Sequence, residues 1–402
     1  MLDVTRLISR AGRVLTGVDR VELAYLSHLS DDPTPFFAIA RTSLGYVLLD
    51  RTGARALLSR ASGQTTWGAA DLTSRLARKA SAMTRRAESD LRRLALGRCL
   101  RQRLPGLLGR HVPPGAAYLN TGHSNVTRAM LTRVKLGTGG PVWVFIHDTI
   151  PLDFPQFQRP GTPEKFRTLL EQVSRHADGV IYNSDVTRRD AERWMGGVGR
   201  VPPGVVAHLG VEPATPRPDQ IPAKIHLERP YFMAIGTIEP RKNHALLLDV
   251  WQDLAADLTP DQMPGLLICG QRGWNNEPVF RRLDQLPPGG PVTELNGLSD
   301  GALSALLSGA RALLQPSIVE GFGLPPVEAA ALGVTVVAPD LPIYREVLGD
   351  RPVYPGHTDK YYWSTTIKDL LTGERHGYTT TDKGDFEPPS WDSHFNIVLR
   401  YT

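Results

Sequence analysis

The sequence predicts an α/β protein made of two doubly wound domains. The chain has 402 residues, more than one typical hydrophobic core accommodates, so two domains are expected. Short apolar runs alternate with segments of helical periodicity, a pattern typical of buried parallel strands joined by crossover helices. The alternation lapses over residues 213–230, where five prolines punctuate a polar stretch, and then restarts. We therefore expect a linker at 213–230.

The first domain, residues 1–212, contains strands and helices in the order that a parallel sheet requires. A loop at 16–20 leads into a helix over 21–29, where Val21, Tyr25 and Leu29 recur at helical spacing. A second helix is expected over 164–176, and a third, capped by Ser184 or Asp185, to Met195. The apolar runs that predict strands are 36–40, 46–49, 116–120, 142–146 and 179–183.

The second domain, residues 231–385, repeats the alternation. Its expected strands are 231–235, 266–269, 312–314 and 334–338. Its expected helices are 244–258, 300–310 and 326–332. The tail, residues 386–402, is expected to form a terminal helix that returns to the first domain.

The composition excludes several classes of protein. Hydrophobic residues make up 41% and charged residues 22% of the chain, as in ordinary globular proteins. Cys99 and Cys269 lie far apart, which predicts neither a disulfide framework nor a metal site and favours a reducing cytoplasm. The first residues lack the form of a signal peptide, and no apolar run approaches the ~20 residues that span a bilayer.

The positive charge is concentrated in residues 51–110. This basic block holds 14 Arg and Lys residues against three acidic residues, whereas the net charge of the whole chain is only +5. One interpretation is basic helices over 70–104 that contact an anionic membrane surface; the other is an arginine-rich solvated face. Nucleic acid is not expected, because no aromatic residues interleave with these arginines to stack on bases.

The stretch from Leu313 to Gly333 is typical of a strand, a glycine-containing loop and a helix. Pro325 or Pro326 suits the first helical turn, and Gly333 suits the position after the helix end. A helix N-terminus attracts anions, and two carboxylates, Glu320 and Glu328, bracket the loop. The stretch therefore indicates either a grip on a ligand with phosphate and sugar parts, or an ordinary helix start with an acidic residue.

A second loop, Gly236 to His244, follows the strand at 231–235. Gly236 allows the backbone to turn close to a ligand. Arg241 and Lys242 then place two cations at a helix start, where acidic residues are normally preferred. An anion such as a diphosphate would remove this conflict; the alternative is a surface Arg–Lys pair.

Several of these motifs together resemble one enzyme family. The run Gly236–Asn243 resembles the donor-diphosphate loop of retaining GT-B glycosyltransferases of the family-4 type (glycosyl transferases group 1), and Glu320 to Glu328 resembles their E-x7-E motif. Residues 145–152 are similar to the family's HD-x-IP strand end. Residues 16–20 resemble a loop of the branch linked to bacterial surface polysaccharides. The resemblance implies a GT-B fold, in which two Rossmann-like domains face each other across a cleft, the first binding the acceptor.

The resemblance also implies residue roles. Arg241 and Lys242 would hold the donor diphosphate, Glu320 the donor sugar and Glu328 the ribose. His147 would lie beside the donor sugar and support the transition state, or be a structural histidine. Asp148 would orient His147 or cap the next loop, and Gly17 would approach the donor phosphate or the acceptor, or be a plain turn glycine. Further donor-binding positions are Gly236, Thr237, Gly270, Leu298, Gly321, Phe322, Gly323 and Leu324; at Leu298, a simple Ser299 helix cap is an equal interpretation.

The resemblance implies a retaining hexosyltransferase, with GDP-mannose as the first choice of nucleotide-sugar donor. The acceptor would be a glycan or lipid-linked saccharide in capsule, exopolysaccharide or O-antigen (lipopolysaccharide) assembly, in the cytoplasm or on the inner face of its membrane. No metal and no cofactor are expected. Two alternatives remain: a sugar-nucleotide epimerase or phosphorylase on the same scaffold, and a non-catalytic membrane-associated scaffold.

Overall fold

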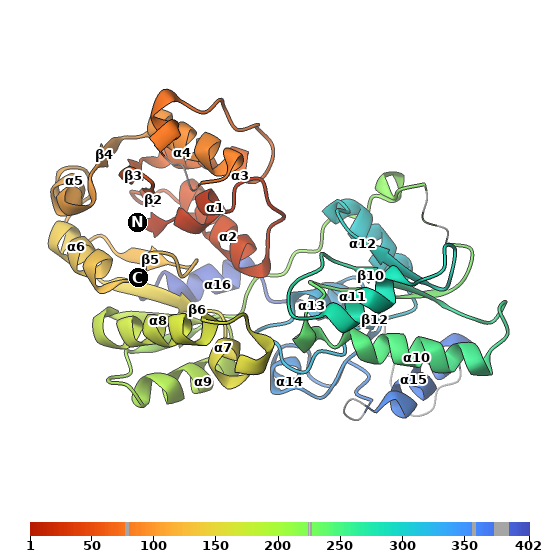
Figure 1. Cartoon of the computed structure of the whole chain (residues 1–402). Helices are drawn as coiled ribbons and strands as arrows, with labels where there is room; N and C mark the ends of the chain where they lie inside the picture. Colours follow the sequence, from red (N-terminus) through yellow and green to blue (C-terminus); the bar gives the residue numbers. More distant parts are fainter. Residues whose placement is uncertain (77–79, 224, 226, 356–358, 374–385) are drawn as a thin grey trace. The chain divides into compact units, whose positions relative to one another are not determined.

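The computed structural model describes residues 1–76, 80–223, 225, 227–355, 359–373 and 386–402 (Figure 1). Parts of three predictions lie outside the described residues: 77–79 of the basic block, 224 and 226 of the linker, and 356–358 and 374–385 of the second domain. The chain divides into two compact units. Unit 1 comprises residues 1–147, 164–209 and 391–402, and unit 2 comprises residues 148–163 and 210–390. The unit boundaries thus differ from the predicted domains, because residues 148–163 belong to unit 2.

Unit 1 is built on an eight-stranded sheet in the order β4-β3-β2-β1-β5-β6-β7-β8. Its strands are β1 (Leu2–Asp3), β2 (Ala38–Thr42), β3 (Gly45–Leu49), β4 (Gly97–Cys99), β5 (Tyr118–Asn120), β6 (Val142–Ile146), β7 (Gly179–Tyr182) and β8 (Gly204–Val206). From β2 to β8 all pairs are parallel, but β3 pairs antiparallel with both β2 and β4. The first edge of the sheet therefore departs from the parallel pattern that the sequence predicts, because β2 and β3 form a hairpin around Ser43 and Leu44.

The helices of unit 1 pack on this sheet. They are α1 (Thr5–Ser9), α2 (Gly17–Asp31), α3 (Arg51–Ala61), η1 (Leu72–Leu76), α4 (Ala82–Leu94), η2 (Arg101–Arg103), α5 (Leu104–His111), α6 (Arg128–Thr138), α8 (Thr162–His176), α9 (Asp185–Gly196) and α16 (Trp391–Val398). The terminal helix α16 belongs to unit 1: His394 is hydrogen-bonded to Tyr25 at 2.7 Å, and the ring of Phe395 packs on Tyr25.

Two predicted elements of unit 1 need correction. Helix α2 begins at Gly17, not at Val21, because Thr16 and Asp19 form a capping box whose buried carboxylate also pairs with Arg6 at 2.6 Å. The basic stretch 70–104 is not one or two helices. It contains a short 3-10 turn, helix α4, strand β4 and a second 3-10 turn, so Leu100 lies outside any amphipathic helix.

Unit 2 is built on a five-stranded sheet in the order β11-β10-β9-β12-β13, with all pairs parallel. Its strands are β9 (Tyr231–Ile235), β10 (Gly265–Cys269), β11 (Val292–Leu295), β12 (Leu313–Leu314) and β13 (Val336–Val337). Its helices are α7 (Ile150–Asp153), η3 (Pro155–Phe157), η4 (Pro218–Gln220), η5 (Pro240–Lys242), α10 (His244–Asp257), α11 (Glu277–Asp284), α12 (Asp300–Gly309), α13 (Leu324–Ala331), α14 (Pro342–Leu348) and α15 (Lys360–Thr372). Phe232, Trp251 and Trp363 lie in one continuous core beneath this sheet. The predicted α/β class is confirmed.

Candidate active site

The candidate site of unit 2 lies where two neighbouring strands end. Strands β9 and β12 are parallel partners, so the loops that follow them, 236–243 and 315–323, leave the same edge of the sheet. This carboxyl edge is where open α/β sheets bind their ligands. The two loops are joined by the backbone, because the Ile318 amide donates to the Arg241 carbonyl at 2.8 Å.

The Glu320 carboxylate is the centre of this site. Its Oε2 accepts a hydrogen bond from Arg241 Nη1 at 2.7 Å, and its Oε1 accepts one from Lys242 Nζ. Oε1 also accepts from Ser317 Oγ at 2.7 Å and from Gln315 Nε2 at 3.0 Å. The side chain is only 6% exposed, so a buried carboxylate is held by two cations and two neutral donors.

The pKa values follow from this burial and pairing. Burial alone would raise the pKa of Glu320, but Lys242 and then Arg241 hold it well below its usual range. Burial lowers the pKa of Lys242, which Glu320 opposes. A second carboxylate, Glu239, pairs with Arg241 Nε at 2.7 Å, and burial raises its pKa. The two cations therefore face two carboxylates of the protein itself.

This pairing changes the interpretation of the two cations near the start of helix α10. The sequence predicts an anion beside Arg241 and Lys242, which stand near the start of a helix, or else a surface Arg–Lys pair. In the structure they lie in the turn η5 and their charge is balanced by Glu320 and Glu239. A ligand diphosphate would have to share these cations with Glu320. The role of the two cations in donor binding remains a prediction.

Two glycines allow the loops after β9 and β10 to approach closely. A Cβ on Gly270 would lie 1.9 Å from the Gly236 carbonyl oxygen, so only glycine fits there. Gly236 itself has φ of 139°, a conformation that side chains avoid. Both positions are predicted to bind the donor, and the structure shows that the backbone requires glycine at each. Thr237 follows directly, and its methyl group lies against Gly273.

Helix α13 starts at Leu324, two residues before the predicted start at 326, and carries the predicted proline in its first turn. Its N-cap is Gly323, in the left-handed conformation with φ of 85°, and Pro325 lies in the first turn. A Cβ on Gly323 would come within 2.6 Å of the Tyr344 ring, so the loop is closely packed. Gly321, Phe322, Leu324 and Glu328 lie around this start, with Phe322 buried and Glu328 partly exposed. Gly333 has positive φ just past the helix end, which confirms its predicted position.

The loop after β10 makes a contact that the sequence did not reveal. Trp274 Nε1 donates to the Phe157 carbonyl at 2.9 Å, and Asn275 donates to the Gln158 carbonyl at 3.0 Å. The Arg159 guanidinium lies 4.8 Å from the centroid of the Trp274 ring. This loop thus holds the segment 155–159. Near the next predicted position, Leu298, Ser299 Oγ caps helix α12 by accepting from the Ala302 amide.

His147 follows strand β6 in unit 1. Its Nε2 donates to the Thr121 carbonyl at 2.6 Å, which leaves Nδ1 as the unprotonated, accepting nitrogen of a neutral ring. Burial lowers the pKa of His147 well below its usual value, and His123, with its ring centroid 5.2 Å away, adds to this. The ring thus makes the backbone bond expected of a structural histidine, and a catalytic role stays a prediction.

Asp148 and Gly17 have local structural roles. Asp148 Oδ1 accepts from the Ile150 amide at 3.0 Å, which is the loop cap named as one of its two predicted roles. Burial raises the pKa of Asp148, and Arg241 opposes this. Gly17 is the first residue of α2 rather than a turn glycine. Among the described residues, no group of three or more His, Cys, Asp or Glu side chains is placed to hold a metal ion.

A comparison with known protein families finds a match within unit 2. Residues 218–374 match the family model described as "Glycosyl transferases group 1". These residues are therefore similar to the domain of group 1 glycosyltransferases. The Arg241–Lys242–Glu320 cluster and the start of α13 lie within the matched residues.

The relatives found by sequence are mannosyltransferases. The serotype-specific mannosyltransferase WbdA of Escherichia coli is 30% identical over 223 residues, which cover 52% of this chain and 27% of the relative. The O-antigen chain mannosyltransferase RfbU of Salmonella typhimurium is 34% identical over 143 residues, covering 35% of this chain and 38% of the relative. The chain therefore spans less than two thirds of these curated relatives.

Solved structures agree on the fold. HepE of Anabaena, solved with UDP and glucose, superposes with a TM-score of 0.53 at 17% identity, covering 76% of this chain and 78% of that one. Sucrose-phosphate synthase of Thermosynechococcus elongatus gives a TM-score of 0.50 at 17% identity, covering 74% of each chain. The fold is GT-B, as predicted. No helix among the described residues is long and apolar enough to cross a membrane.

Proposed function

We propose that the protein is a retaining glycosyltransferase that moves a hexose, mannose as first choice, from a nucleotide-diphosphate sugar to a glycan or lipid-linked saccharide. The observation that carries the proposal is the buried cluster of Arg241, Lys242 and Glu320 at the carboxyl edge of the unit 2 sheet. One relative is named as a serotype-specific mannosyltransferase and another as an O-antigen chain mannosyltransferase. These names support mannose as the transferred sugar and surface polysaccharide synthesis as the process.

The proposed reaction uses the cluster as an anion site. The bond between the sugar C1 and the diphosphate oxygen breaks, and C1 forms a bond to the acceptor hydroxyl oxygen on the same face. The hydroxyl proton passes to the departing diphosphate oxygen. Arg241 and Lys242 would stabilise the charge on the leaving diphosphate. Glu320 would hold these cations in place and meet the sugar hydroxyls, and Glu328 would accept from the ribose. No metal ion or cofactor is part of this proposal.

The test begins with donor binding. A panel of GDP-, UDP-, dTDP- and ADP-sugars is compared by thermal stabilisation, where a ligand at 100 times its Kd adds about 2.7 kcal/mol of stability. Transfer from the stabilising donor is then measured in Lys242→Ala and Glu320→Ala. Both variants are expected to lose transfer while the matched surface variant Lys368→Ala, whose partner is Asp257 on the exposed face of α10, keeps it. Full activity in both site variants would refute the proposal.

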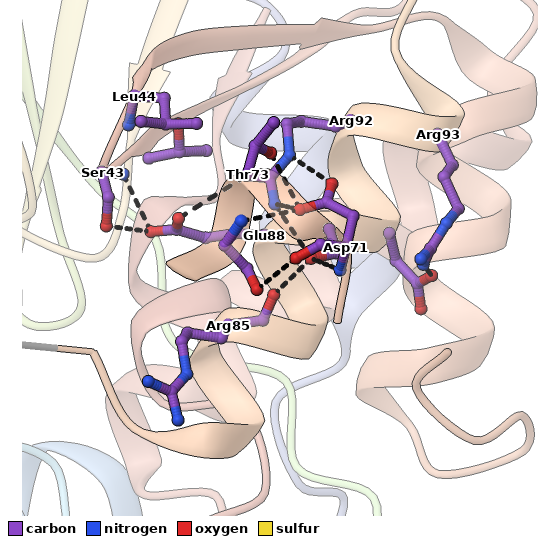
Figure 2. A network of polar contacts seen from close by, with 12 residues as sticks. Ser43, Leu44, Asp71, Thr73, Arg85, Glu88, Arg92 and Arg93 are labelled. Carbon is purple, nitrogen blue, oxygen red and sulfur yellow. Dashed lines mark hydrogen bonds and ion pairs between the residues drawn. The ribbon is translucent and has the colours of Figure 1, made fainter. Parts of the chain in front are cut away.

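The proposal includes contact between the basic block and a membrane. It limits this contact to a few of the arginines of residues 51–110. Arg60 and Arg93 pair with Asp90, and Arg92 pairs with Asp71 (Figure 2). Arg60 and Arg92 are largely buried and hold helix α4 to the rest of unit 1, whereas Arg93 is 46% exposed. The exposed arginines 98, 101, 103 and 110 follow later in the block. Vesicle sedimentation with anionic and with neutral lipid would test contact through these four.

A further inference from the structure

Glu239 is a buried residue of the loop after β9 that the proposed reaction does not use. Its side chain is only 4% exposed. One carboxyl oxygen, Oε1, forms an ion pair with Arg241 Nε at 2.7 Å. The other oxygen, Oε2, is buried and has no hydrogen-bond partner within the described part of the chain. Buried polar atoms are nearly always paired, so this oxygen requires an explanation.

Glu239 and Glu320 are supported very differently. Both oxygens of Glu320 accept hydrogen bonds, from two cations and two neutral donors, and these bonds favour its ionised form. Glu239 has a single ionic contact. Burial raises the pKa of its carboxyl, although Arg241 and Lys242 oppose this shift. Of the two glutamates, Glu239 is therefore the one that takes up a proton more readily.

The charges around Glu239 do not balance. Arg241 and Lys242 carry two positive charges, and the two glutamates that pair with them carry two negative charges. A third carboxylate, Asp148, belongs to the same unit. Burial raises the pKa of Asp148, Arg241 opposes this, and both glutamates add to it, so all of these charges act on one another. With every carboxyl ionised, the cluster has one negative charge in excess.

Three further groups lie beside the cluster. His244 begins α10, and burial lowers the pKa of its ring to about 4, so the ring is neutral at pH 7. Tyr344 of α14 is buried, which raises the pKa of its hydroxyl group, so this group is neutral as well. Arg272 lies in the loop after β10, but it pairs with Asp284 at 2.8 Å and with Glu294 at 2.7 Å. None of the three supplies an unpaired positive charge.

Arg241 is the member of the cluster that a ligand can reach. Its side chain is 21% exposed, whereas that of Lys242 is 9% exposed. Nε faces Glu239, and Nη1 donates to Glu320 and to the Val319 carbonyl. Nη2 makes no hydrogen bond to the described residues, so a diphosphate oxygen can bind there while the other nitrogens keep their partners. The ligand would bring two more negative charges to a cluster that already has one in excess.

We propose that Glu239 is a positioning residue of the anion site and that it takes up a proton when a nucleotide-diphosphate sugar binds. Before binding, its carboxylate fixes the direction of the Arg241 side chain. On binding, a proton from solvent forms an O–H bond with Oε2, which reduces the negative charge beside the diphosphate. The proton returns to solvent when the diphosphate leaves, and no other bond changes. The inference rests on the proposed function, because it assigns a role at the same anion site.

Binding should become tighter as the pH falls, because the bound state holds more protons than the free state. If about half a proton is taken up per ligand, the Kd rises about threefold from pH 6.5 to 7.5. GDP-mannose is the first probe and UDP-glucose the second. Both phosphates of these compounds are esterified, whereas the terminal phosphate of free GDP itself titrates at about pH 6 and would obscure the effect.

Calorimetry on the full chain measures the proton directly. Each probe is titrated at pH 7.5 in HEPES and in Tris, two buffers of different ionisation enthalpy, and the difference between the apparent binding enthalpies gives the number of protons taken up. About half a proton per ligand is expected. Glu239→Gln keeps an oxygen for Arg241 but has no carboxyl to protonate. It should bind without proton uptake, and its Kd should not change between pH 6.5 and 7.5.

Further variants separate positioning from proton uptake. Glu239→Ala removes the contact that directs Arg241, so it should raise the Kd about tenfold, whereas Glu239→Gln restores the affinity. Asp148→Asn keeps Glu239 and should still take up a fraction of a proton. The matched control is Asp257→Asn, which breaks the exposed pair with Lys368 and should leave both the Kd and the proton uptake unchanged.

Two outcomes would overturn the inference. Equal binding enthalpies in both buffers, with the same Kd at pH 6.5 and 7.5, would show that no proton is taken up. Uptake that persists in Glu239→Gln and disappears in Asp148→Asn would assign the proton to Asp148. In both cases the nucleotide sugar still binds, so the proposed function stands. If neither nucleotide sugar binds the unmodified protein, the proposed function itself is contradicted.

Discussion

Glu320 accepts a 2.7 Å hydrogen bond from Arg241, one of the two cations proposed to hold the donor diphosphate. The carboxylate also accepts from Lys242, so both cations are shared with a charge of the protein itself. Such an arrangement keeps two buried cations charged and in place before a ligand arrives. It also means that the carboxylate competes with the diphosphate, and this competition can be measured.

Glu320→Gln is expected to bind nucleoside diphosphate about fivefold more tightly while losing transfer. The substitution removes a negative charge close to both cations but keeps an oxygen that accepts hydrogen bonds. The expected gain in binding free energy, about 1 kcal/mol, is small compared with the interaction of two partly buried charges. Calorimetry with GDP and UDP measures the affinity, because neither compound carries the sugar that Glu320 is proposed to contact. Asp257→Asn, which breaks the exposed pair with Lys368 on another part of the unit, serves as the control. Weaker binding in Glu320→Gln would contradict the competition.

Lys242→Met is expected to lower the free energy of unfolding of unit 2 by about 3 kcal/mol, because it leaves a buried carboxylate with one cation fewer. The double variant Lys242→Met/Glu320→Gln should lose less than the sum of the single variants, since it removes both partners. Urea unfolding followed by tryptophan fluorescence gives the three values. Lys368→Met, which breaks an exposed pair, should cost less than about 1 kcal/mol. Additive effects in the double variant would show that the two side chains are not coupled.

Gly270→Ala is expected to weaken nucleotide binding and to destabilise unit 2 by about 3 kcal/mol, as overpacked positions do. The added Cβ would lie 1.9 Å from the Gly236 carbonyl oxygen, so the loops after β9 and β10 must separate. Gly106→Ala meets no atom within 4 Å and should be neutral or slightly stabilising. Thermal unfolding and nucleotide titration of both variants measure the difference; an unchanged Kd in Gly270→Ala would show that the loop after β10 does not shape the site.

The sequence predicted four of the five strands of the unit 2 sheet, because these four are short apolar runs. Strand 231–235 was predicted at its observed bounds, as was strand 142–146 of unit 1. Strand β11 was missed because Thr293 and Glu294 interrupt its apolar pattern and lie only partly buried. The hairpin of β2 and β3 was not foreseen as antiparallel, since strand direction depends on a two-residue turn that carries little sequence signal.

The site was predicted in part. The pairing of Arg241 and Lys242 with Glu320 joins residues nearly 80 positions apart, and no local pattern indicates which charges meet.

The ion pairs of the basic block could not be predicted from the sequence either. Its composition suggested a uniformly basic surface, whereas Asp71 and Asp90 bind several of its arginines. Charge counts therefore indicated where cations gather, but only the fold shows which of them are free.

Lowering the pH from 7.5 to 5 is expected to destabilise unit 1 through its buried histidines. Burial lowers the pKa of His123 to about 4, whereas in the unfolded chain it titrates near its ordinary value of 6.5. Below pH 6.5 the unfolded chain therefore binds more protons, and stability falls until the folded ring protonates near pH 4. At pH 5 His123 alone accounts for a loss of about 2 kcal/mol, and His147, whose pKa is lowered in the same direction, adds to it. Glu320 acts over a separate pH range, because its lowered pKa makes the protein less stable only as the pH falls below the ordinary value of 4.5.

His123→Gln keeps a donor for the Phe145 carbonyl and should flatten the decline of stability between pH 6.5 and 5 in thermal unfolding. The same slope in the variant and the unmodified protein would show that His123 does not carry the effect.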